Sequence, residues 1–301
     1  MNNYWRNIVG GVVCSMTVLS GPVAAADGEQ GLPIWQVDGH QNQIFLLGSI
    51  HLLREQDHPL PGAIYDAYEE AETLIMELDM DDIDPVATQA MTNELGLIEN
   101  GGTLTDLLGP QVYAEAAALA VAAEIPLKLL DRAEPWYAAM NVEMMLLMRM
   151  GFNPAFGIES HIMERAVNDN KEIRGFETMR QQLGFLDGLS QEAQQEMFLQ
   201  ALAEGPEMRE LMDSLIEAWR IGDTAFLEES MLKDMQDYPE LNQAIVVNRN
   251  IDWTGQIEEL MDDEDDYLVI VGALHLIGEE GVPKLLLSRG HKVSQLRQSI
   301  N

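Results

Sequence analysis

Two histidines in this sequence follow one short pattern. Each stands three residues after a glycine that closes an aliphatic run: Gly48 precedes His51, and Gly272 precedes His275. A third apolar run leads directly into Glu77. Two imidazoles and a carboxylate can bind Zn, Mn, Co or Fe and leave positions open for water and substrate. Without a metal, the same groups could act as a general base with an orienting acid, and the spacing alone also allows ordinary structural histidines.

Short apolar runs predict the strands that position these groups. They cover residues 44–47, 74–76, 127–130 and 268–271, each bounded by Gly, Pro or charge, as is typical of strands buried on both faces of a sheet. Ligands bind at the carboxyl ends of parallel strands, so both histidines and Glu77 are expected at one edge. Gly48 and Gly272 would let the backbone turn there or let a ligand approach closely.

Helical patterns fill most of the remaining chain. Residues 110–124 and 207–220 predict helices, and residues 134–256 are helical in pattern apart from one possible strand at 172–176. No linker divides the chain, so the strands nearest its two ends must meet in one sheet. We therefore predict a single α/β domain over residues 27–301, with a mostly parallel central sheet and a large helical layer or inserted helical lobe.

Residues 1–26 have the anatomy of a signal peptide. A weakly basic start precedes an apolar segment diluted by small residues, and Ala24-Ala25-Ala26 stands before Asp27. An uncleaved anchor is the alternative, but the segment is short of the ~20 residues that span a bilayer. We expect a periplasmic or secreted bacterial protein with no stable membrane span after cleavage. Cys14, the sole cysteine, would leave with the signal, which excludes disulfides and thiolate chemistry.

The charge balance limits the partners. The chain has 17 Lys and Arg against 51 Asp and Glu, a formal net charge of −34, which repels nucleic-acid phosphates and anionic lipids. Nucleotide-binding glycine loops and the Gly-x-Ser-x-Gly elbow of serine hydrolases are absent from the sequence. The expected partner is a peptide or a small-molecule substrate, not nucleic acid, and nothing in the sequence indicates an oligomeric state.

A series of motifs resembles the TraB/PrgY/GumN family in order and spacing, from Trp35 to about Val293. The motifs are Trp35-Gln36-Val37, Gly48-Ser49-Ile50-His51, Ile75-Met76-Glu77-Leu78-Asp79, Gly175-Phe176-Glu177-Thr178 with Gln181 and Gln182, Asn248-Arg249-Asn250 before Trp253, and Val271-Gly272-Ala273-Leu274-His275-Leu276 with Gly278 and Gly281. The resemblance implies kinship with the Tiki metalloproteases and, more distantly, with erythromycin esterase (EreA) and haem-binding ChaN-like proteins. It also implies an α/β fold in which paired histidines and glutamates line one site.

Position by position, the resemblance implies site roles for His51, Glu77 and His275, with Glu177 and Arg249 as further members. Residue 176 is Phe where the family more often has Leu, which is a change in packing. On the sequence alone, Glu177 could instead serve the start of a helix at Thr178, and Arg249 could form a surface salt bridge. Glu159 and His161 lack the second histidine of a zincin, so we interpret them as helix residues.

These features give a leading hypothesis of a metal-dependent hydrolase that acts on peptides. His51, Glu77 and His275 would hold a divalent Mn, Co or Zn ion, Glu177 would serve as general acid or base, and Arg249 would stabilise developing negative charge. One alternative is a regulatory protein that binds a peptide or small ligand without turning it over. Another is a metal-free ester or lactone hydrolase with a histidine base.

Overall fold

The computed structural model describes residues 29–203, 208–235 and 237–299. The predicted signal peptide, including Cys14, lies outside these residues, so cleavage and export stay predictions. Within the described part, no helix combines the length and the apolar character needed to cross a membrane.

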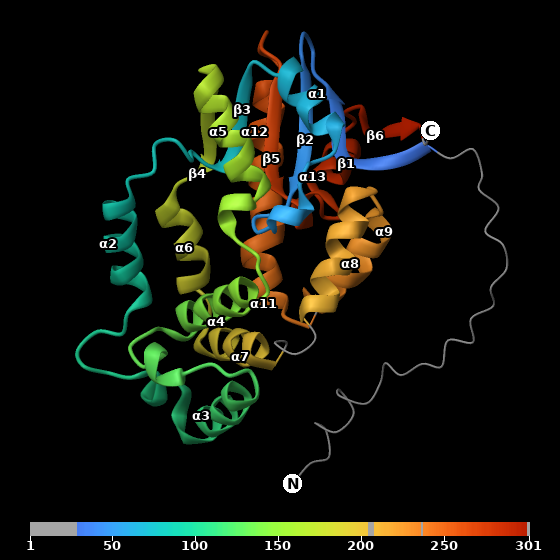
Figure 1. The fold of residues 1–301 in the computed structure, drawn as a ribbon. Helices are drawn as coiled ribbons and strands as arrows, with labels where there is room; N and C mark the ends of the chain where they lie inside the picture. Colours follow the sequence, from blue (N-terminus) through green and yellow to red (C-terminus); the bar gives the residue numbers. More distant parts are fainter. Residues whose placement is uncertain (1–28, 204–207, 236, 300–301) are drawn as a thin grey trace, which may run out of the picture.

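The described residues form a sheet of six strands in the order β4-β3-β5-β2-β1-β6 (Figure 1). The strands are β1 (Glu29–Asp38), β2 (Gln43–Ser49), β3 (Thr73–Leu78), β4 (Glu172–Glu177), β5 (Tyr267–Gly272) and β6 (Val293–Ser299). Strands β2, β3, β4 and β5 are parallel, whereas β1 pairs antiparallel with both β2 and β6. The α/β class and the mostly parallel sheet predicted from the sequence are confirmed.

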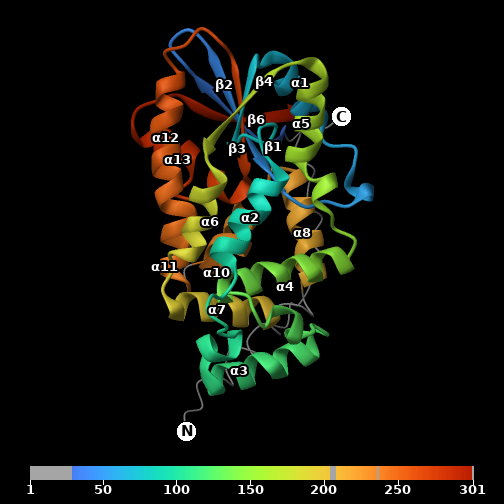
Figure 2. The same ribbon diagram turned by 90° about the vertical axis from the view of Figure 1, so that its left-hand side faces the viewer.

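The central strands are apolar on both faces because helices cover both faces. Every residue of β3 and of β5 is buried. One face packs on α1 (Gly62–Glu70), α5 (Ile158–Asp169) and α8 (Met208–Arg220), and the other on α12 (Asn248–Leu260) and α13 (Val282–Ser288), as Figure 2 shows. Adjacent residues of β2 point to opposite sides, so Leu47 joins the first core and Leu46 the second.

A helical lobe lies beyond the carboxyl edge of the sheet (Figure 1). It has its own core, built where α3 (Leu104–Ala122), α4 (Pro135–Arg149) and α7 (Gln191–Ala203) pack together. The other α-helices between β3 and α12 are α2 (Pro85–Gly96), α6 (Met179–Asp187), α9 (Thr224–Leu227), α10 (Lys233–Met235) and α11 (Pro239–Asn242). The same stretch contains the π-helical turns η4 (Glu228–Leu232) and η5 (Gln243–Val247). Between residues 134 and 256, the described part of the chain is helical except for β4 and the turns that connect the elements.

One predicted strand is wrong. Residues 127–130 form the 3-10 helix η2 (Leu127–Leu130), in which Leu130 is buried but Leu129 is 75% exposed. A strand buried on both faces needs cover over every side chain, and this segment has it over one. The helix expected at 110–124 begins earlier, because Thr103 caps α3, which then kinks at Gly109. Helix α8 is described from Met208, so Glu207 lies outside the described residues.

Candidate active site

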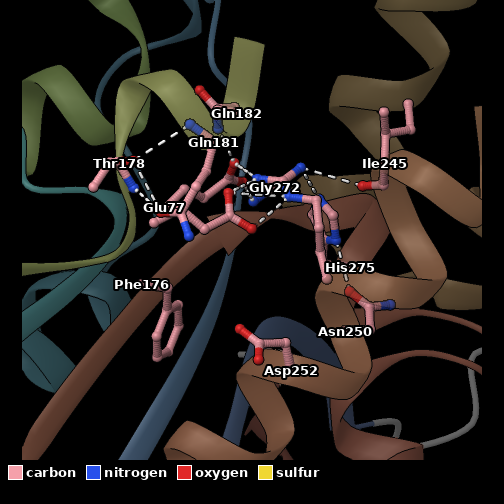
Figure 3. Close-up of polar contacts among 12 residues, drawn as sticks. Glu77, Phe176, Thr178, Gln181, Gln182, Ile245, Asn250, Asp252, Gly272 and His275 are labelled. Atoms are coloured by element: carbon pink, nitrogen blue, oxygen red, sulfur yellow. Dashed lines mark hydrogen bonds and ion pairs between the residues drawn. The ribbon is translucent and has the colours of Figure 1, made fainter. Parts of the chain in front are cut away.

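The carboxyl edge of the sheet brings all five predicted site residues together. His51 follows β2, Glu77 lies in β3, Glu177 ends β4, and His275 lies in the 3-10 turn η6 (Ala273–Leu276) directly after β5. Arg249 reaches the same edge from α12. Figure 3 shows Glu77, Gly272 and His275 converging between the sheet and this helix.

The two glycines let the ends of β2 and β5 approach each other. A side chain on Gly48 would lie 3.2 Å from the Cα atom of Ala273, which is tighter than most real contacts. The indole N–H of Trp219 donates to the Gly48 carbonyl at 2.6 Å and fixes this turn from α8. The predicted role of Gly48 as a structural turn therefore has a steric basis in the fold.

Glu77 is the buried anion at the centre of the site. Its Oε1 accepts from the Gly272 N–H at 2.8 Å, while its Oε2 accepts from Arg249 Nη2 at 2.6 Å and from Gln182 Nε2 at 3.0 Å. Burial alone would raise the pKa of Glu77, but the positive charges that surround it outweigh burial and hold the pKa well below its usual range. The carboxylate is therefore ionised at neutral pH.

His275 is held as a buried neutral imidazole. Its side chain is 7% exposed, and its Nδ1 lies 2.7 Å from the Asn250 Oδ1. The Asn250 amide nitrogen donates to the Glu280 carbonyl at 2.8 Å, so Oδ1 accepts, and we assign the ring proton to Nδ1 of His275. Burial lowers the pKa of His275 to about 3. This arrangement leaves an Nε2 lone pair 4.0 Å from Glu77 Oε1.

His51 faces the same carboxylate oxygen but lies in a more exposed environment than His275. Its side chain is 57% exposed, and its Nε2 also lies 4.0 Å from Glu77 Oε1. Its Nδ1 lies 2.6 Å from Glu159, whose carboxylate accepts a further hydrogen bond from the Ser49 hydroxyl. The negative charge of Glu159 raises the pKa of His51 to about 9 against the opposing effect of burial. His51 is therefore protonated at neutral pH.

Arg249 connects the buried groups. Its Nε and Nη2 donate to Glu177 at 2.9 Å, and Nη2 donates also to Glu77. Its Nη1 donates to the Ile245 carbonyl at 3.2 Å and faces His275 Nε2 at 3.3 Å. All five N–H groups of a guanidinium are thereby engaged. Because Arg249 is 8% exposed, the alternative of a surface salt bridge is wrong.

Glu177 serves this site through Arg249. It is buried, which raises its pKa, while the Arg249 guanidinium opposes that shift. It lines neither of the two pockets that His51 lines. The neighbouring Thr178 caps α6 (Met179–Asp187), so the helix expected to start at Thr178 begins one residue later. In this arrangement Glu177 positions Arg249; its predicted role as general acid or base stays a prediction.

A small open space lies among His51, Glu77 and His275. A methyl group on Gly272 would lie 3.4 Å from His51 Nε2, 3.5 Å from Glu77 Oε1 and 3.6 Å from the His275 ring. Two imidazole nitrogens and a carboxylate oxygen suit a divalent metal in type, and each imidazole is oriented through its other nitrogen, as in metal sites. Over the described part of the chain, however, no three His, Cys, Asp or Glu side chains are spaced to hold a metal ion.

Two pockets meet at the His51–Glu77 wall. The first, which we call the apolar pocket, has a volume of 360 Å³ and is lined by His51, Glu77, His275 and Arg249 at its polar end. The second, the head pocket, has a volume of 250 Å³ and is lined also by Glu159, Ser160 and Gln182. A ligand that spans both pockets would pass directly over the histidines.

Sequence reasoning missed two residues of this site. Glu159 lies in α5 as predicted, but its carboxylate also orients His51. Asn250 is fully buried and orients His275. Asn250 stands beside Arg249 in a motif already singled out, so its position was a usable signal. Glu159 had none, because only the fold brings α5 to the end of β2.

Comparison with known proteins places these features in one family. Residues 33–295 match the TraB/PrgY/gumN family. The chain is 22% identical over 254 residues to the uncharacterized protein YbaP of Escherichia coli (strain K12), covering 80% of this chain and 86% of the relative. It is also 22% identical over 292 residues to an uncharacterized protein of Treponema pallidum (strain Nichols), covering 92% of this chain and 86% of the relative. No solved structure matches the chain significantly.

Proposed function

The chain belongs to the TraB/PrgY/gumN family, and from the geometry of its site we propose that it is a hydrolase of peptide or related acyl bonds. One observation carries the proposal. His51 and His275 are each oriented through Nδ1, and each directs Nε2 toward the same oxygen of Glu77 across an open space. That space lies where two pockets meet, so a bound substrate would present its scissile bond to it.

The two histidines have opposite protonation states, which suits acid–base chemistry. Environments that push pKa values apart separate the donor of a proton from its acceptor. Without a metal, His51, with its pKa raised to about 9, carries a proton that it can give to a leaving group. His275, with its pKa lowered to about 3, is neutral, and a water molecule or a metal would compete with Arg249 Nη1 for its Nε2 lone pair.

We propose a divalent ion, Mn, Co or Zn, as the cofactor, with His51, Glu77 and His275 as its ligands. The donor types fit, and the space beside Gly272 is open. The spacing is wider than in a formed site, because tetrahedral ligands about 2.0–2.1 Å from a metal lie closer together than 4.0 Å. His51 is the most exposed of the three ligands, and its Nδ1 is held by Glu159. A bound ion would supply a water of lowered pKa.

The metal-free hydrolase with a histidine base is the second candidate, and the contacts of Arg249 favour it. Its Nη1 already faces His275 Nε2, and its Nη2 already neutralises Glu77, so a cation is present where a metal would compete. In that case Arg249 supplies the positive charge of the site. Its N–H groups are all engaged, so charge alone, not a free donor, would stabilise an oxyanion.

The test combines metal analysis with turnover in a pair of glycine variants. Gly272→Ala would put a methyl among the histidines at ordinary contact distances, and Gly255→Ala in α12 would meet no atom within 4 Å. The purified chain is dialysed against Mn²⁺, Co²⁺ and Zn²⁺, analysed for metal and incubated with a mixture of peptides and N-acyl amides that is read by mass spectrometry. We expect about one ion per chain and cleaved products from the wild type and Gly255→Ala, and a loss of both in Gly272→Ala.

Each other result has a defined meaning. Products without metal, unaffected by a chelator but lost in Gly272→Ala, would select the metal-free mechanism. A retained peptide with no product under any metal would overturn the hydrolase and support a binding protein. Equal turnover in Gly272→Ala and Gly255→Ala would show that the chemistry takes place elsewhere.

A further inference from the structure

The apolar pocket has a wall on which the N–H and C=O groups of a peptide backbone would find no hydrogen-bond partners. Away from the histidines, its side chains are aliphatic or thioether groups from five different elements, among them Leu147, Met212, Leu215, Leu227, Met231 and Ile245. Trp219 also lines it, but its only polar atom is already bonded to the Gly48 carbonyl. Buried amides without hydrogen-bond partners are costly, so the group that enters deeply must be purely apolar.

The volume of this pocket exceeds that of a single side chain. An apolar cavity of about 150 Å³ already holds a whole benzene ring. The apolar pocket, at 360 Å³, is more than twice that size. A flexible aliphatic chain fills such a space, and one Leu or Phe side chain would leave more than half of it empty.

The opposite end of the path has a larger share of charged and polar groups. Met76, Leu78, Met80 and Pro154 form part of the wall of the head pocket, but Glu77, Glu159 and Gln182 also line it, and both carboxylates lie against the protonated His51. The whole chain carries a formal net charge of −34, which disfavours the approach of an anion. The group that occupies the head pocket is therefore polar and either neutral or cationic.

We infer that the substrate is an acyl compound with an aliphatic chain of about eight to twelve carbons and a small head that is not anionic. This inference rests on the proposed hydrolase and names its substrate class. Arg249 lines the apolar pocket and not the head pocket, so the carbonyl of the substrate lies in the apolar pocket, next to the aliphatic chain of the substrate. The oxygen of water bonds to the acyl carbon and the C–N or C–O bond breaks. One proton of the water passes to the released amine or alcohol, and the other leaves with the carboxylic acid.

The first experiment measures occupation of the pocket without chemistry. Calorimetric titration of the full chain with 1-decanol and 1-butanol should give binding of the long alcohol alone. Leu215→Trp, on the pocket wall, should abolish it, whereas Leu211→Trp, one turn away on α8 and 39% exposed, should not. Equal affinity for the two alcohols, or unchanged decanol binding in a folded Leu215→Trp, would overturn the inference.

The second experiment measures turnover along a chain-length series. N-acyl lysinamides with acyl groups of 2, 4, 8, 10 and 16 carbons are compared as substrates of the wild-type chain. This comparison does not depend on whether any variant folds. Each added methylene should raise kcat/KM about fourfold, at ~0.8 kcal/mol per buried CH₂, until the pocket is full. Leu215→Trp should move the optimum to shorter chains, and an N-acyl glutamate should react more slowly than the lysinamide of equal chain length.

The two experiments separate the inference from the proposed function. Decanol binding without hydrolysis of any acyl compound would support a site for an aliphatic chain and overturn the proposed hydrolase. Hydrolysis with an optimum at two carbons, or a preference for N-acetyl-phenylalaninamide over the decanoyl compound, would leave the hydrolase standing. Either of those results would overturn the aliphatic chain and assign the pocket to a short acyl group or to a peptide side chain.

Discussion

The ends of β2 and β5 share one sequence pattern, and the fold gives them opposite surroundings. His275, after β5, is buried, bonded to the amide of Asn250 and neutral. His51, after β2, is 57% exposed, bonded to the carboxylate of Glu159 and protonated. Two different causes set the difference: burial lowers the pKa of His275, whereas the negative charge of Glu159 raises the pKa of His51. A repeated motif can thus supply two distinct chemical groups.

The largest effect that we expect comes from Arg249, which touches the β5 histidine and not the β2 histidine. Arg249→Met leaves Glu77 and Glu177 buried without their cation, and breaking one partner of a buried ion pair costs about 3–5 kcal/mol. Denaturant unfolding at pH 7 measures this loss. Arg174→Met, which breaks an exposed pair with Glu172, should cost less than about 1 kcal/mol. Similar losses for the two variants would show that the buried network contributes no more than the surface.

The next effect tests the partner of His275. Asn250→Ala removes the acceptor of the Nδ1 proton and leaves the Glu280 carbonyl unpaired, for a loss of about 2 kcal/mol in the free energy of unfolding. Asn248→Ala, two residues earlier and exposed, is the matched control and should change stability by less than about 0.5 kcal/mol. An unchanged midpoint in Asn250→Ala would mean that His275 holds its position without this amide.

The pH dependence of stability distinguishes His51, at the end of β2, from His275, at the end of β5. His51 has a folded-state pKa of about 9, above its unfolded value near 6.5, so its contribution to stability is complete below pH ~6.5 and is lost as the pH rises through 9. His275, at about 3, acts in the opposite sense: its contribution is lost as the pH falls from ~6.5 toward 3. NMR titration of the histidine ring protons should resolve both values.

Exchange of Glu159, the Nδ1 partner of His51, should change the pKa of His51 and leave the pKa of His275 unchanged. Glu159→Gln removes the charge that raises the pKa of His51, so that pKa should fall toward 6.5, while His275 stays neutral. Glu164→Gln, an exposed position on the same helix, should leave both histidines unchanged. A His51 pKa that stays near 9 in Glu159→Gln would contradict the assignment of Glu159 as its partner.

The smallest expected effect lies at the Ser49 hydroxyl, which donates to Glu159 behind His51. Ser49→Ala removes one hydrogen bond to a buried carboxylate, for a loss of about 1 kcal/mol, and should shift the His51 pKa less than Glu159→Gln does. The half-buried Ser160→Ala is the control. A larger shift in Ser49→Ala than in Glu159→Gln would reverse the order of influence described here.

The sequence predicted the parts of the fold that depend on local pattern. Aliphatic runs identified β2, β3 and β5, and the shared glycine–histidine spacing placed both histidines at one edge. The same rule failed at residues 127–130, because an apolar run has the same composition in a strand and in a 3-10 turn. Strands β1 and β6 were not singled out, since their residues are mixed in polarity and pair only with each other and β2.

The candidate site was predictable to the extent that its residues follow strands. Glu159 and the full engagement of Arg249 could not be predicted, since both depend on how α5 and α12 pack against the edge. The pKa difference between the two histidines was equally hidden. Its causes are the burial of His275 beneath the packed elements and the charge of Glu159 on α5, and both depend on the tertiary fold.

The position of β5 in the sheet also governs when the site can form. Strand β5 lies between β3 and β2, yet it is synthesised long after them, and the Gly272–Glu77 hydrogen bond joins residues 195 positions apart. While the chain grows from its N-terminus, β2 and β3 have no shared neighbour and Glu77 has no Gly272 to bond. Non-local pairings of this kind form slowly. The arrangement of His51, Glu77 and His275 can consequently form only after almost the entire chain has been made.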